Sequence, residues 1–334
     1  MNLFKILALV GLLTAGCQSR VHPPVVLAPP TLIAGGKIWD AAPHNAFTDL
    51  IRYRGKWFCT FRESDGHVGR GDGKIRLLVS SDGTRWESAA LLTESGVDLR
   101  DPKLSITPDQ RLMLLAGGSV YAGGKLRGRQ PRVAFSPDGR QWTSLQRVAA
   151  EGDWLWRVTW HQGQAYGIAY SDNGIKLLVS GNGRDYRLVT NLAVPGQPNE
   201  ATLRFLPNGD CAALVRRDAG DKQAWVGRSS APFRDWHWAP VGMQIGGPNF
   251  LVLEHAGMLA SGRQYRNDKW ADSKTFVGRM DPVTGAVQPD LILPSGGDCS
   301  YPGMVVYRGE LWVSYYSSHE GRTGIYLARV KLGK

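Results

Sequence analysis

A short cluster, Ser-x-Asp/Asn-Gly-x-x-aromatic, recurs along the 334-residue chain and constrains its fold more than any other feature. It reads SSDGTRW at 80–86, SPDGRQW at 136–142, SGNGRDY at 180–186 and, degraded, SAPFRDW at 230–236, so successive clusters start 56, 44 and 50 residues apart. This spacing is typical of β-propeller blades. The Asp can accept hydrogen bonds from turn amides, the Gly can take a positive φ, and the aromatic ring can pack between strands. The cluster therefore predicts a structural turn between the third and fourth strands of a blade.

A second repeat, two apolar strands joined by a tight turn, occurs six times. Its copies lie at 49–62, 101–117, 157–170, 200–216, 249–264 and 301–316, and no long amphipathic helix interrupts them after residue 31. The last copy is followed by one more strand at 323–332, and residues 31–38 can supply the missing fourth strand. The sequence predicts an all-β, six-bladed β-propeller whose last blade is closed by the N-terminal strand. Five or seven blades would require a missed or doubled repeat.

The first residues have the features of an export signal. Residues 1–16 combine Lys5 with an apolar stretch too short to span a membrane. The sequence LTAGC at 13–17 is similar to the bacterial lipobox, whose Cys is lipidated, and an ordinary cleaved signal is the alternative. We expect a signal peptide at 1–16, a Pro-rich tether at 17–31 that starts with lipidated Cys17 on the outer membrane, and a propeller domain at 32–334.

Net charge and cysteine content limit which partners and cofactors can be expected. The formal net charge of +11 favours anionic partners such as acidic glycans, but the basic residues are scattered, so we expect no nucleic-acid groove. Three cysteines besides Cys17 do not suggest a disulfide framework, and no CxxC or HExxH spacing indicates a zinc site. We expect a monomer without cofactor or metal that contacts the membrane only through its lipid.

The innermost strands of a propeller converge on its axis, so equivalent positions of the six repeats are candidates for a binding site. The strand starts hold Asp49, Asp101, Arg157, Glu200, Asn249 and Tyr301, and the returning strands hold Arg62, Tyr170, Arg216, Gln264 and Tyr316, with Arg263 adjacent. Arginines, carboxylates and tyrosines gathered in this way indicate a site for an anionic or polyhydroxylated ligand. Ion pairs lining the channel are the alternative for Arg62 and Arg216, and a packed ring is the alternative for Tyr301.

The blade count and turn clusters resemble the sialidase superfamily, whose repeated Asp-box is Ser-x-Asp-x-Gly-x-Thr-Trp. The stretch NEATLRFLPNGDCAALVR at 199–216 is similar to the sialidase segment in which a Glu opens a strand and an Arg follows sixteen residues later. CSYPGMV at 299–305 is similar to the segment that carries the nucleophilic Tyr. The resemblance covers most of residues 40–332. It implies that Glu200 activates Tyr301, whose phenol needs a neighbouring base, and that Arg216 binds a substrate carboxylate.

The resemblance also implies an acid, on the loop at 62–74, that protonates the leaving oxygen. Sialidases use Asp, which favours Asp65, whereas His67 and Asp72 are alternatives because an unperturbed His titrates near pH 6.5. The first blade lacks the arginine that sialidases place there, since residues 45–49 read NAFTD. Arg100 and Arg157 can compensate from other blades, with Arg263 near, and Arg62 and Asp101 are further candidates for substrate contact.

These patterns predict an exo-acting glycoside hydrolase of sialidase type that removes a terminal acidic sugar from extracellular or periplasmic glycans. One alternative is a polysaccharide lyase, or another propeller glycosidase, in which His67 and Tyr301 act as base and acid on a uronic acid. The other alternative is a propeller that binds glycan or assembles envelope proteins without catalysis. Trp154, Trp156 and Trp160 are candidates for stacking on sugar rings, with packing in a blade core as the alternative.

Overall fold

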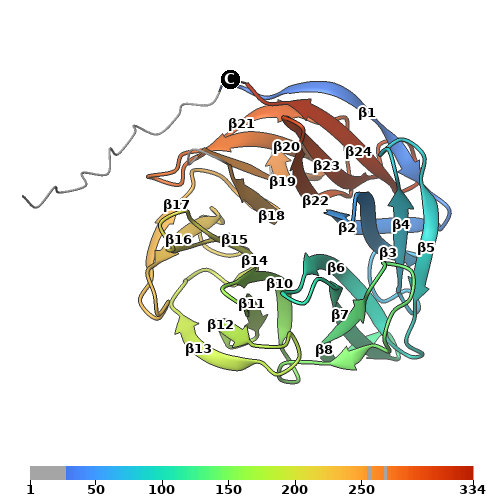
Figure 1. Ribbon diagram of the computed structural model, residues 1–334, viewed down its shortest axis with the longest axis horizontal. Helices are drawn as coiled ribbons and strands as arrows, with labels where there is room; N and C mark the ends of the chain where they lie inside the picture. The colour runs from blue at the N-terminus through green and yellow to red at the C-terminus, as the bar shows by residue number, and fades with distance from the viewer. Residues whose placement is uncertain (1–27, 254–256, 267–268, 334) are drawn as a thin grey trace, which may run out of the picture.

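The computed structural model describes residues 28–253, 257–266 and 269–333, and every regular element among them is a β-strand. The 24 strands form six four-stranded sheets, which surround a common axis like the blades of a propeller (Figure 1). The predicted all-β, six-bladed fold is confirmed. The predicted signal peptide, Cys17 and the tether up to residue 27 lie outside the described residues. No helix long and apolar enough to cross a membrane occurs in the described ranges.

Five blades consist of four consecutive antiparallel strands each. Blade 1 contains β2 (His44–Tyr53), β3 (Lys56–Ser64), β4 (Lys74–Ser80) and β5 (Glu87–Leu92). Blade 2 contains β6 (Asp98–Ile106), β7 (Leu112–Ala122), β8 (Lys125–Ser136) and β9 (Gln146–Arg147). Blade 3 contains β10 (Trp154–His161), β11 (Gln164–Ser171), β12 (Gly174–Ser180) and β13 (Arg187–Leu192). Blade 4 contains β14 (Pro198–Phe205), β15 (Cys211–Arg217), β16 (Trp225–Ser229) and β17 (His237–Pro240), and blade 5 contains β18 (Ile245–Val252), β19 (Met258–Arg266), β20 (Lys269–Met280) and β21 (Val287–Ile292).

Blade 6 joins the two ends of the domain, as predicted. It contains β22 (Cys299–Tyr307), β23 (Glu310–Ser317) and β24 (Gly324–Lys331), and its outermost strand is β1 (Thr31–Trp39). β1 pairs antiparallel with β24 from Thr31↔Lys331 to Trp39↔Ile325, and the two strands lie side by side at the rim in Figure 1. Thr31, predicted as the last tether residue, is already the first residue of β1. The pairing leaves β24 without an exposed edge.

The turn clusters take the structural role predicted for them. In blade 1 the cluster follows β4, and Asp82 Oδ1 accepts hydrogen bonds from the amides of Thr84 and Arg85 at 2.8 and 3.0 Å. Gly83 has a φ of +79°, and the indole of Trp86 donates to its carbonyl at 3.1 Å. The amide contacts lower the pKa of the Asp82 carboxyl, so the turn is held by a carboxylate that stays charged.

Each innermost strand contains a β-bulge, and the bulges decide which side chains reach the axis. In β2, β6, β10, β14, β18 and β22 two residues face one residue of the next strand; these pairs are 47–48, 101–102, 156–157, 199–200, 247–248 and 301–302. The first residue of four of these pairs has a positive φ: Phe47, Asp101, Gly247 and Tyr301. The bulges therefore turn a ring of residues out of the regular alternation and toward the channel.

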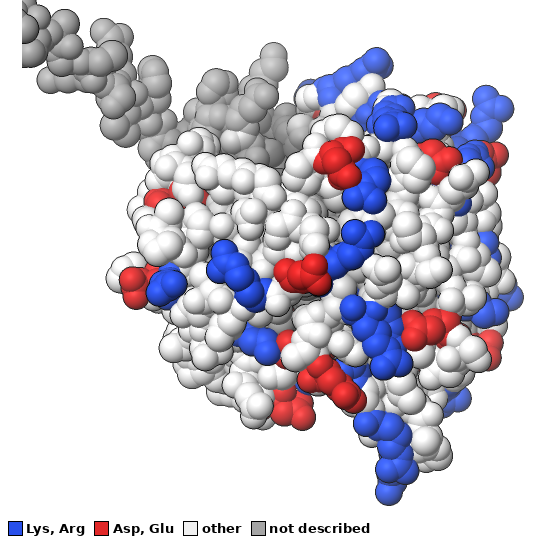
Figure 2. Space-filling model, turned by 60° about the horizontal axis from the view of Figure 1, so that its bottom comes forward, with Lys and Arg blue, Asp and Glu red and all other residues white. Residues whose placement is uncertain are grey.

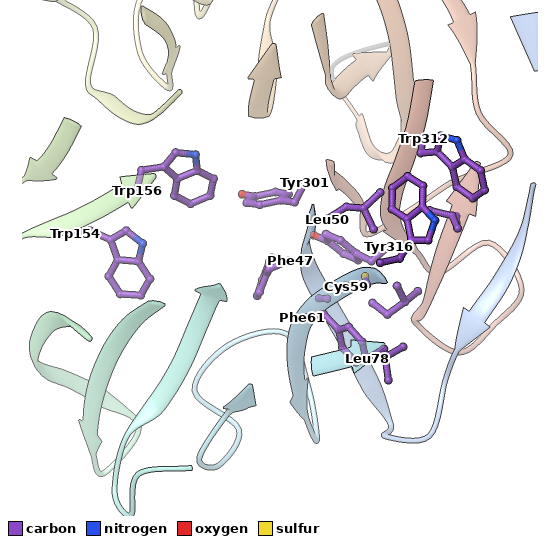
Figure 3. Close-up of a cluster of buried hydrophobic side chains, with 14 residues drawn as sticks. Phe47, Leu50, Cys59, Phe61, Leu78, Trp154, Trp156, Tyr301, Trp312 and Tyr316 are labelled. Atoms are coloured by element: carbon purple, nitrogen blue, oxygen red, sulfur yellow. The ribbon is translucent and has the colours of Figure 1, made fainter. Parts of the chain in front are cut away.

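Aromatic side chains from several blades pack around these bulges (Figure 3). Trp154 and Trp156 are 2 % and 1 % exposed, so they cannot stack on a sugar from solvent, and they take the packing role weighed against stacking. Trp160 is partly buried and packs against the cluster between blades 2 and 3. All three tryptophans therefore take the packing role that was the alternative. At the junction of blades 1 and 6, Trp57 lies against Trp312 with ring centroids 4.4 Å apart.

Candidate functional site

The predicted pair of Tyr301 and Glu200 meets at the axis. The Tyr301 hydroxyl, from the bulge of β22, donates a 2.5 Å hydrogen bond to Oε1 of Glu200, from the bulge of β14. Arg216 lies opposite that second bulge on β15, and its Nη1 donates to Glu200 Oε2 at 3.0 Å and to the Tyr301 hydroxyl at 3.1 Å. The amide of Gly247 donates to Glu200 Oε2 at 2.7 Å. Three blades thus hold the phenol and the carboxylate in contact.

The surroundings of Tyr301 keep its phenol protonated. Burial and the negative charge of Glu200 raise the pKa of Tyr301 well above its ordinary value, although Arg216 and Arg263 oppose the shift. The phenol is therefore a poor nucleophile in the free protein. It can attack only as its proton passes to Glu200, and their 2.5 Å contact allows that transfer.

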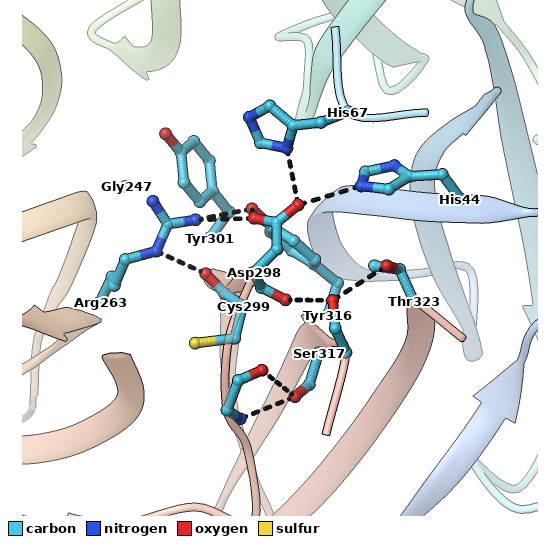
Figure 4. A network of polar contacts seen from close by, with 12 residues as sticks. His44, His67, Gly247, Arg263, Asp298, Cys299, Tyr301, Tyr316, Ser317 and Thr323 are labelled. Carbon is cyan, nitrogen blue, oxygen red and sulfur yellow. Dashed lines mark hydrogen bonds and ion pairs between the residues drawn. The ribbon is translucent and has the colours of Figure 1, made fainter. Parts of the chain in front are cut away.

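A second polar cluster lies beside this pair (Figure 4), and two of its members, Asp298 and His44, were not predicted from the sequence. Its centre is Asp298, directly before β22, whose Oδ2 contacts His67 Nδ1 at 2.6 Å and His44 Nε2 at 3.0 Å. Its Oδ1 accepts from the Tyr316 hydroxyl at 2.7 Å and from Arg263 Nη2 at 3.3 Å. Burial opposes ionisation of Asp298, but the contacts from both histidines and the charge of Arg263 outweigh it and lower the pKa of this carboxyl.

Of the three candidate acids, only His67 joins this network. Asp65 is exposed and makes no hydrogen bond with any described residue, and Asp72 Oδ2 accepts from the amide of Gly96 at 2.7 Å, away from Tyr301. The His67 ring lies 5.3 Å from the ring of Phe47, which itself lies 5.2 Å from the ring of Tyr301. The structure thus does not support the acid role that the resemblance assigned to Asp65.

The predicted substrate contact of Arg62 is contradicted, because its side chain is fully buried and its nitrogens are occupied. Nε donates to Asp98 at 2.8 Å, Nη1 donates to the carbonyls of Gly66 and His67, and Nη2 donates to Ser64. Arg62 therefore positions the loop that carries His67. Its ion-pair partner, Asp98, is on blade 2, so Arg62 takes the ion-pair role that was the alternative.

Arg157 is also structural. It is 6 % exposed, and its Nη1 lies 3.0 Å from both carboxylate oxygens of Asp49, which is 2 % exposed. The ion pair with Asp49 engages Nη1 of Arg157, and the predicted substrate contact by Arg157 stays a prediction.

Two predicted residues on blade 2, Asp101 and Arg100, remain candidates for contact with a substrate. Asp101 is a first bulge residue with a φ of +52°, and its Oδ1 is buried with no hydrogen-bond partner in the described part of the chain. Burial raises the pKa of Asp101 to about 6, and Glu200 contributes to the shift. Arg100 lies over the ring of Trp154 at 4.7 Å and donates to Ser119 at 3.0 Å.

Two arginines beside Tyr301 each have one terminal nitrogen outside the hydrogen-bond network, Arg216 on a partly exposed side chain and Arg263 on a buried one. Arg216 Nη2 and Arg263 Nη1 have no hydrogen-bond partner among the described residues, whereas their other nitrogens are engaged. Both arginines approach Tyr301, Arg263 at 5.1 Å from its ring. The blade 1 position where the resemblance expected an arginine instead holds the buried ring of Phe47. An anion would therefore meet two guanidinium groups here rather than three.

Trp270 is a further residue that sequence reasoning missed. It lies on β20, is 46 % exposed, and its ring covers the guanidinium of Arg263 at 4.1 Å and lies 5.9 Å from the ring of His67. An exposed indole beside a sugar-binding site can stack on a pyranose face. The signal in the sequence was weak, because twelve tryptophans occur and most of them could serve blade packing.

His44, His67 and Asp298 also form a possible three-ligand metal set, since their ligand atoms lie within 4.8 Å of one another. However, the separations from Asp298 Oδ2, 2.6 and 3.0 Å, are those of hydrogen bonds. A metal on His44 Nε2 would move the ring proton to Nδ1, which is buried and has no partner in the described ranges. A metal-ligating His normally donates a hydrogen bond from its second nitrogen. The cluster therefore fits a hydrogen-bonded network better than a metal site.

Comparison with solved structures agrees with the fold. A protein of unknown function from Dyadobacter fermentans superimposes with a TM-score of 0.78 at 19 % identity, covering 91 % of this chain and 99 % of that one. The NanB sialidase of Streptococcus pneumoniae gives 0.67 at 10 % identity over 92 % of this chain and 71 % of that one. The α-L-arabinofuranosidase of Fusarium graminearum gives 0.64 at 14 % identity over 91 % and 98 %. No protein-family model matches the chain, and no curated protein matches its sequence.

The architecture thus defines a class: the chain is a sialidase-like six-bladed β-propeller, as the turn clusters and blade count predicted. Within that class it is divergent, since its identity to the sialidase and glycosidase structures is 10–14 %. The neighbours include a sialidase and an arabinofuranosidase, so the shared fold does not by itself define a function.

Proposed function

We propose that this protein is an exo-acting glycoside hydrolase in which Tyr301 is the nucleophile and Glu200 accepts its proton. The observation that carries the proposal is the 2.5 Å hydrogen bond between these two side chains, which come from bulges of blades 6 and 4. A buried phenol against a carboxylate, with Arg216 touching both, provides a nucleophile that is activated only when an electrophilic carbon is in place. Tyrosine nucleophiles of this kind occur in glycosidases.

We further propose that the sugar is acidic. The open Nη2 of Arg216 and Nη1 of Arg263 can each donate to a carboxylate, and both groups flank the nucleophile. Phe47 occupies the place of a third arginine, which favours a smaller or differently oriented acidic sugar than sialic acid. Lys and Arg elsewhere on the visible face are interspersed with Asp and Glu rather than gathered into one patch (Figure 2), so the acidic group is expected to be recognised inside the site.

The test is turnover of a panel of sialosides, uronides, rhamnosides and arabinosides by the mature protein and by Tyr301→Phe. We expect one acidic glycoside to be cleaved and Tyr301→Phe to abolish its turnover while retaining binding, because only the nucleophilic oxygen is lost. Tyr315→Phe is the matched control: this buried tyrosine on the neighbouring strand donates to the carbonyl of Pro294 at 3.1 Å. Equal turnover by Tyr301→Phe and wild type would refute the proposal.

The lyase alternative keeps Tyr301 and His67 in the same site but predicts a different product. Elimination from a uronic acid leaves a conjugated double bond that absorbs in the ultraviolet, whereas hydrolysis leaves a saturated sugar. Product absorbance therefore separates the two reactions. Binding of acidic glycans with no product of either kind would identify the non-catalytic propeller.

A further inference from the structure

The proton donor of the proposed reaction remains to be assigned, because Asp65 is exposed and makes no hydrogen bond to the described residues of the site. Figure 4 shows His67 and the Tyr301 hydroxyl on the same side of the Asp298 network. The His67 ring is 44 % exposed at its side chain, and its Nε2 has no hydrogen-bond partner in the described part of the chain, so this nitrogen is available to a substrate. The other ring nitrogen is fixed on a buried carboxylate at 2.6 Å.

Resting on the function proposed above, we infer that His67 is the catalytic acid and base and that Asp298 is its positioning residue. A carboxylate that accepts from Nδ1–H holds the imidazole in one orientation, fixes the proton that stays on the ring, and stabilises the imidazolium form. Asp298 is itself fixed by Tyr316 and Arg263 on its other oxygen. His44 donates a second hydrogen bond to Asp298 Oδ2, so both oxygens of the Asp298 carboxylate have two partners.

The proton balance closes over two steps. In the first step Tyr301 Oη attacks the anomeric carbon, its proton passes to Glu200, the glycosidic C–O bond breaks, and His67 Nε2–H protonates the departing oxygen. In the second step water attacks the anomeric carbon, the C–O bond to Tyr301 breaks, Glu200 returns its proton to the phenol, and His67 Nε2 accepts a proton from the water. The net reaction is hydrolysis, and every group regains its starting protonation.

The loop geometry supports this assignment independently of the resemblance. Arg62, fully buried, donates to the carbonyl of His67 itself at 3.0 Å and to the carbonyl of Gly66 at 2.7 Å. The rings of Phe47, His44 and Trp270 contact His67 from other segments, at centroid distances of 5.3, 5.5 and 5.9 Å. A surface histidine on a glycine-rich turn would not need a buried arginine and three aromatic contacts to hold it. The backbone and ring are thus placed for a defined role.

The test compares two glycosides of the sugar found in the panel, one with a methyl and one with a dinitrophenyl leaving group. A missing acid matters only when the departing oxygen needs a proton. We therefore expect His67→Ala to lower turnover of the methyl glycoside about 10²–10⁴-fold and that of the dinitrophenyl glycoside less than about tenfold. Asp298→Asn is expected to show the same contrast, because loss of the carboxylate removes the charge that stabilises the protonated His67 ring, the form that donates from Nε2. His161→Ala, a histidine stacked on Phe205 in another blade, is the control expected to leave both rates unchanged.

A readout without substrate tests the pairing itself. Nitrogen-15 spectra of the wild-type histidines are expected to show a proton on Nδ1 of His67 in both the imidazolium and the neutral ring, and Asp298→Asn should move the single proton of the neutral ring to Nε2. The assignment is overturned if His67→Ala slows both glycosides equally, or if Asp65→Ala shows the leaving-group contrast instead. In either case loss of turnover in Tyr301→Phe would still support the hydrolase, so the two failures are distinguishable. If no glycoside is cleaved, the proposed function and this assignment fail together.

Discussion

Replacing Asp49 with Asn tests whether the arginines near the axis stabilise the propeller or bind substrate. Asp49 on β2 of blade 1 contacts Arg157 on β10 of blade 3 and accepts a 2.8 Å hydrogen bond from the amide of Leu104 on β6 of blade 2. The carboxylate therefore links three blades where no water competes. Lys103 is a second buried basic group beside this pair. Its burial and the neighbouring charge of Arg157 lower its pKa to about 8.

The magnitude follows from this burial. Removing one partner of a buried ion pair typically costs about 3–5 kcal/mol, because the remaining charge keeps its desolvation penalty. We expect the upper half of that range for Asp49→Asn, since the variant leaves Arg157 and Lys103 facing each other and turns an amide donor toward Leu104 or Arg157. The corresponding loss of melting temperature is on the order of 10 °C for a domain of this size.

Urea denaturation of the wild type and variants measures the effect. Glu310→Gln is the matched control, because Glu310 pairs with Arg329 through two contacts of 2.9 and 3.0 Å at the surface, where such a pair contributes at most about 1 kcal/mol. The double variant Asp49→Asn/Arg157→Gln should recover part of the loss, because it leaves no unpaired arginine. If Asp49→Asn costs no more than Glu310→Gln, or if Arg157→Gln raises KM without lowering stability, the structural role of the pair is refuted and Arg157 binds substrate.

Three further outcomes are expected. In Gly303→Ala the new Cβ would lie 2.2 Å from the Leu50 amide nitrogen, so unfolding should become easier by at least about 1–3 kcal/mol in a thermal melt; an unchanged melting temperature would contradict the tight contact between blades 6 and 1. Asp101 has a pKa of about 6 in the folded protein against an ordinary 3.8, so the wild type loses stability as the pH rises through this range. Asp101→Asn does not titrate, so its melting temperature relative to that of the wild type should rise between about pH 4 and pH 7. A difference in melting temperature that stays constant with pH would contradict the pKa shift. Trp270→Ala should raise KM about tenfold with little change in kcat, since it removes an exposed ring beside Arg263, and a selective loss of kcat would contradict a binding role.

The fold was predictable because each blade repeats the same local chemistry. The turn clusters fix where the third strand ends, and the strand left over after residue 316 required a partner from the other terminus, which β1 supplies. The contact of Tyr301 with Glu200, 101 residues apart, was also predictable, because the resemblance placed both residues at starts of innermost strands.

Other parts of the site could not be predicted because of the bulges. Counting from each turn assumes regular alternation, but two residues face one in every innermost strand, so Asp49 lies beyond the bulge of its strand rather than in the ring of bulge residues. Asp298 and His44 lie at or before the starts of β22 and β2, where no repeat register applies. Only the closed ring shows that these two segments are neighbours.

The position of the site explains why ring closure matters to the proposed chemistry. Glu200 comes from blade 4, the amide that holds it from Gly247 of blade 5, and Tyr301 from blade 6, while His67 comes from blade 1 and meets Asp298 at the entry to blade 6. The nucleophile and the proton donor therefore face each other across the junction that β1 closes. Thr48 reinforces this junction by donating to the carbonyl of Tyr301 itself at 2.9 Å. β1 and β24 close the same blade that carries the proposed nucleophile, so their pairing keeps Tyr301 of blade 6 aligned with His67 of blade 1. A propeller with an open blade 6 would keep the contact of Glu200 with Arg216, which both belong to blade 4, but would lose the alignment of Tyr301 with His67.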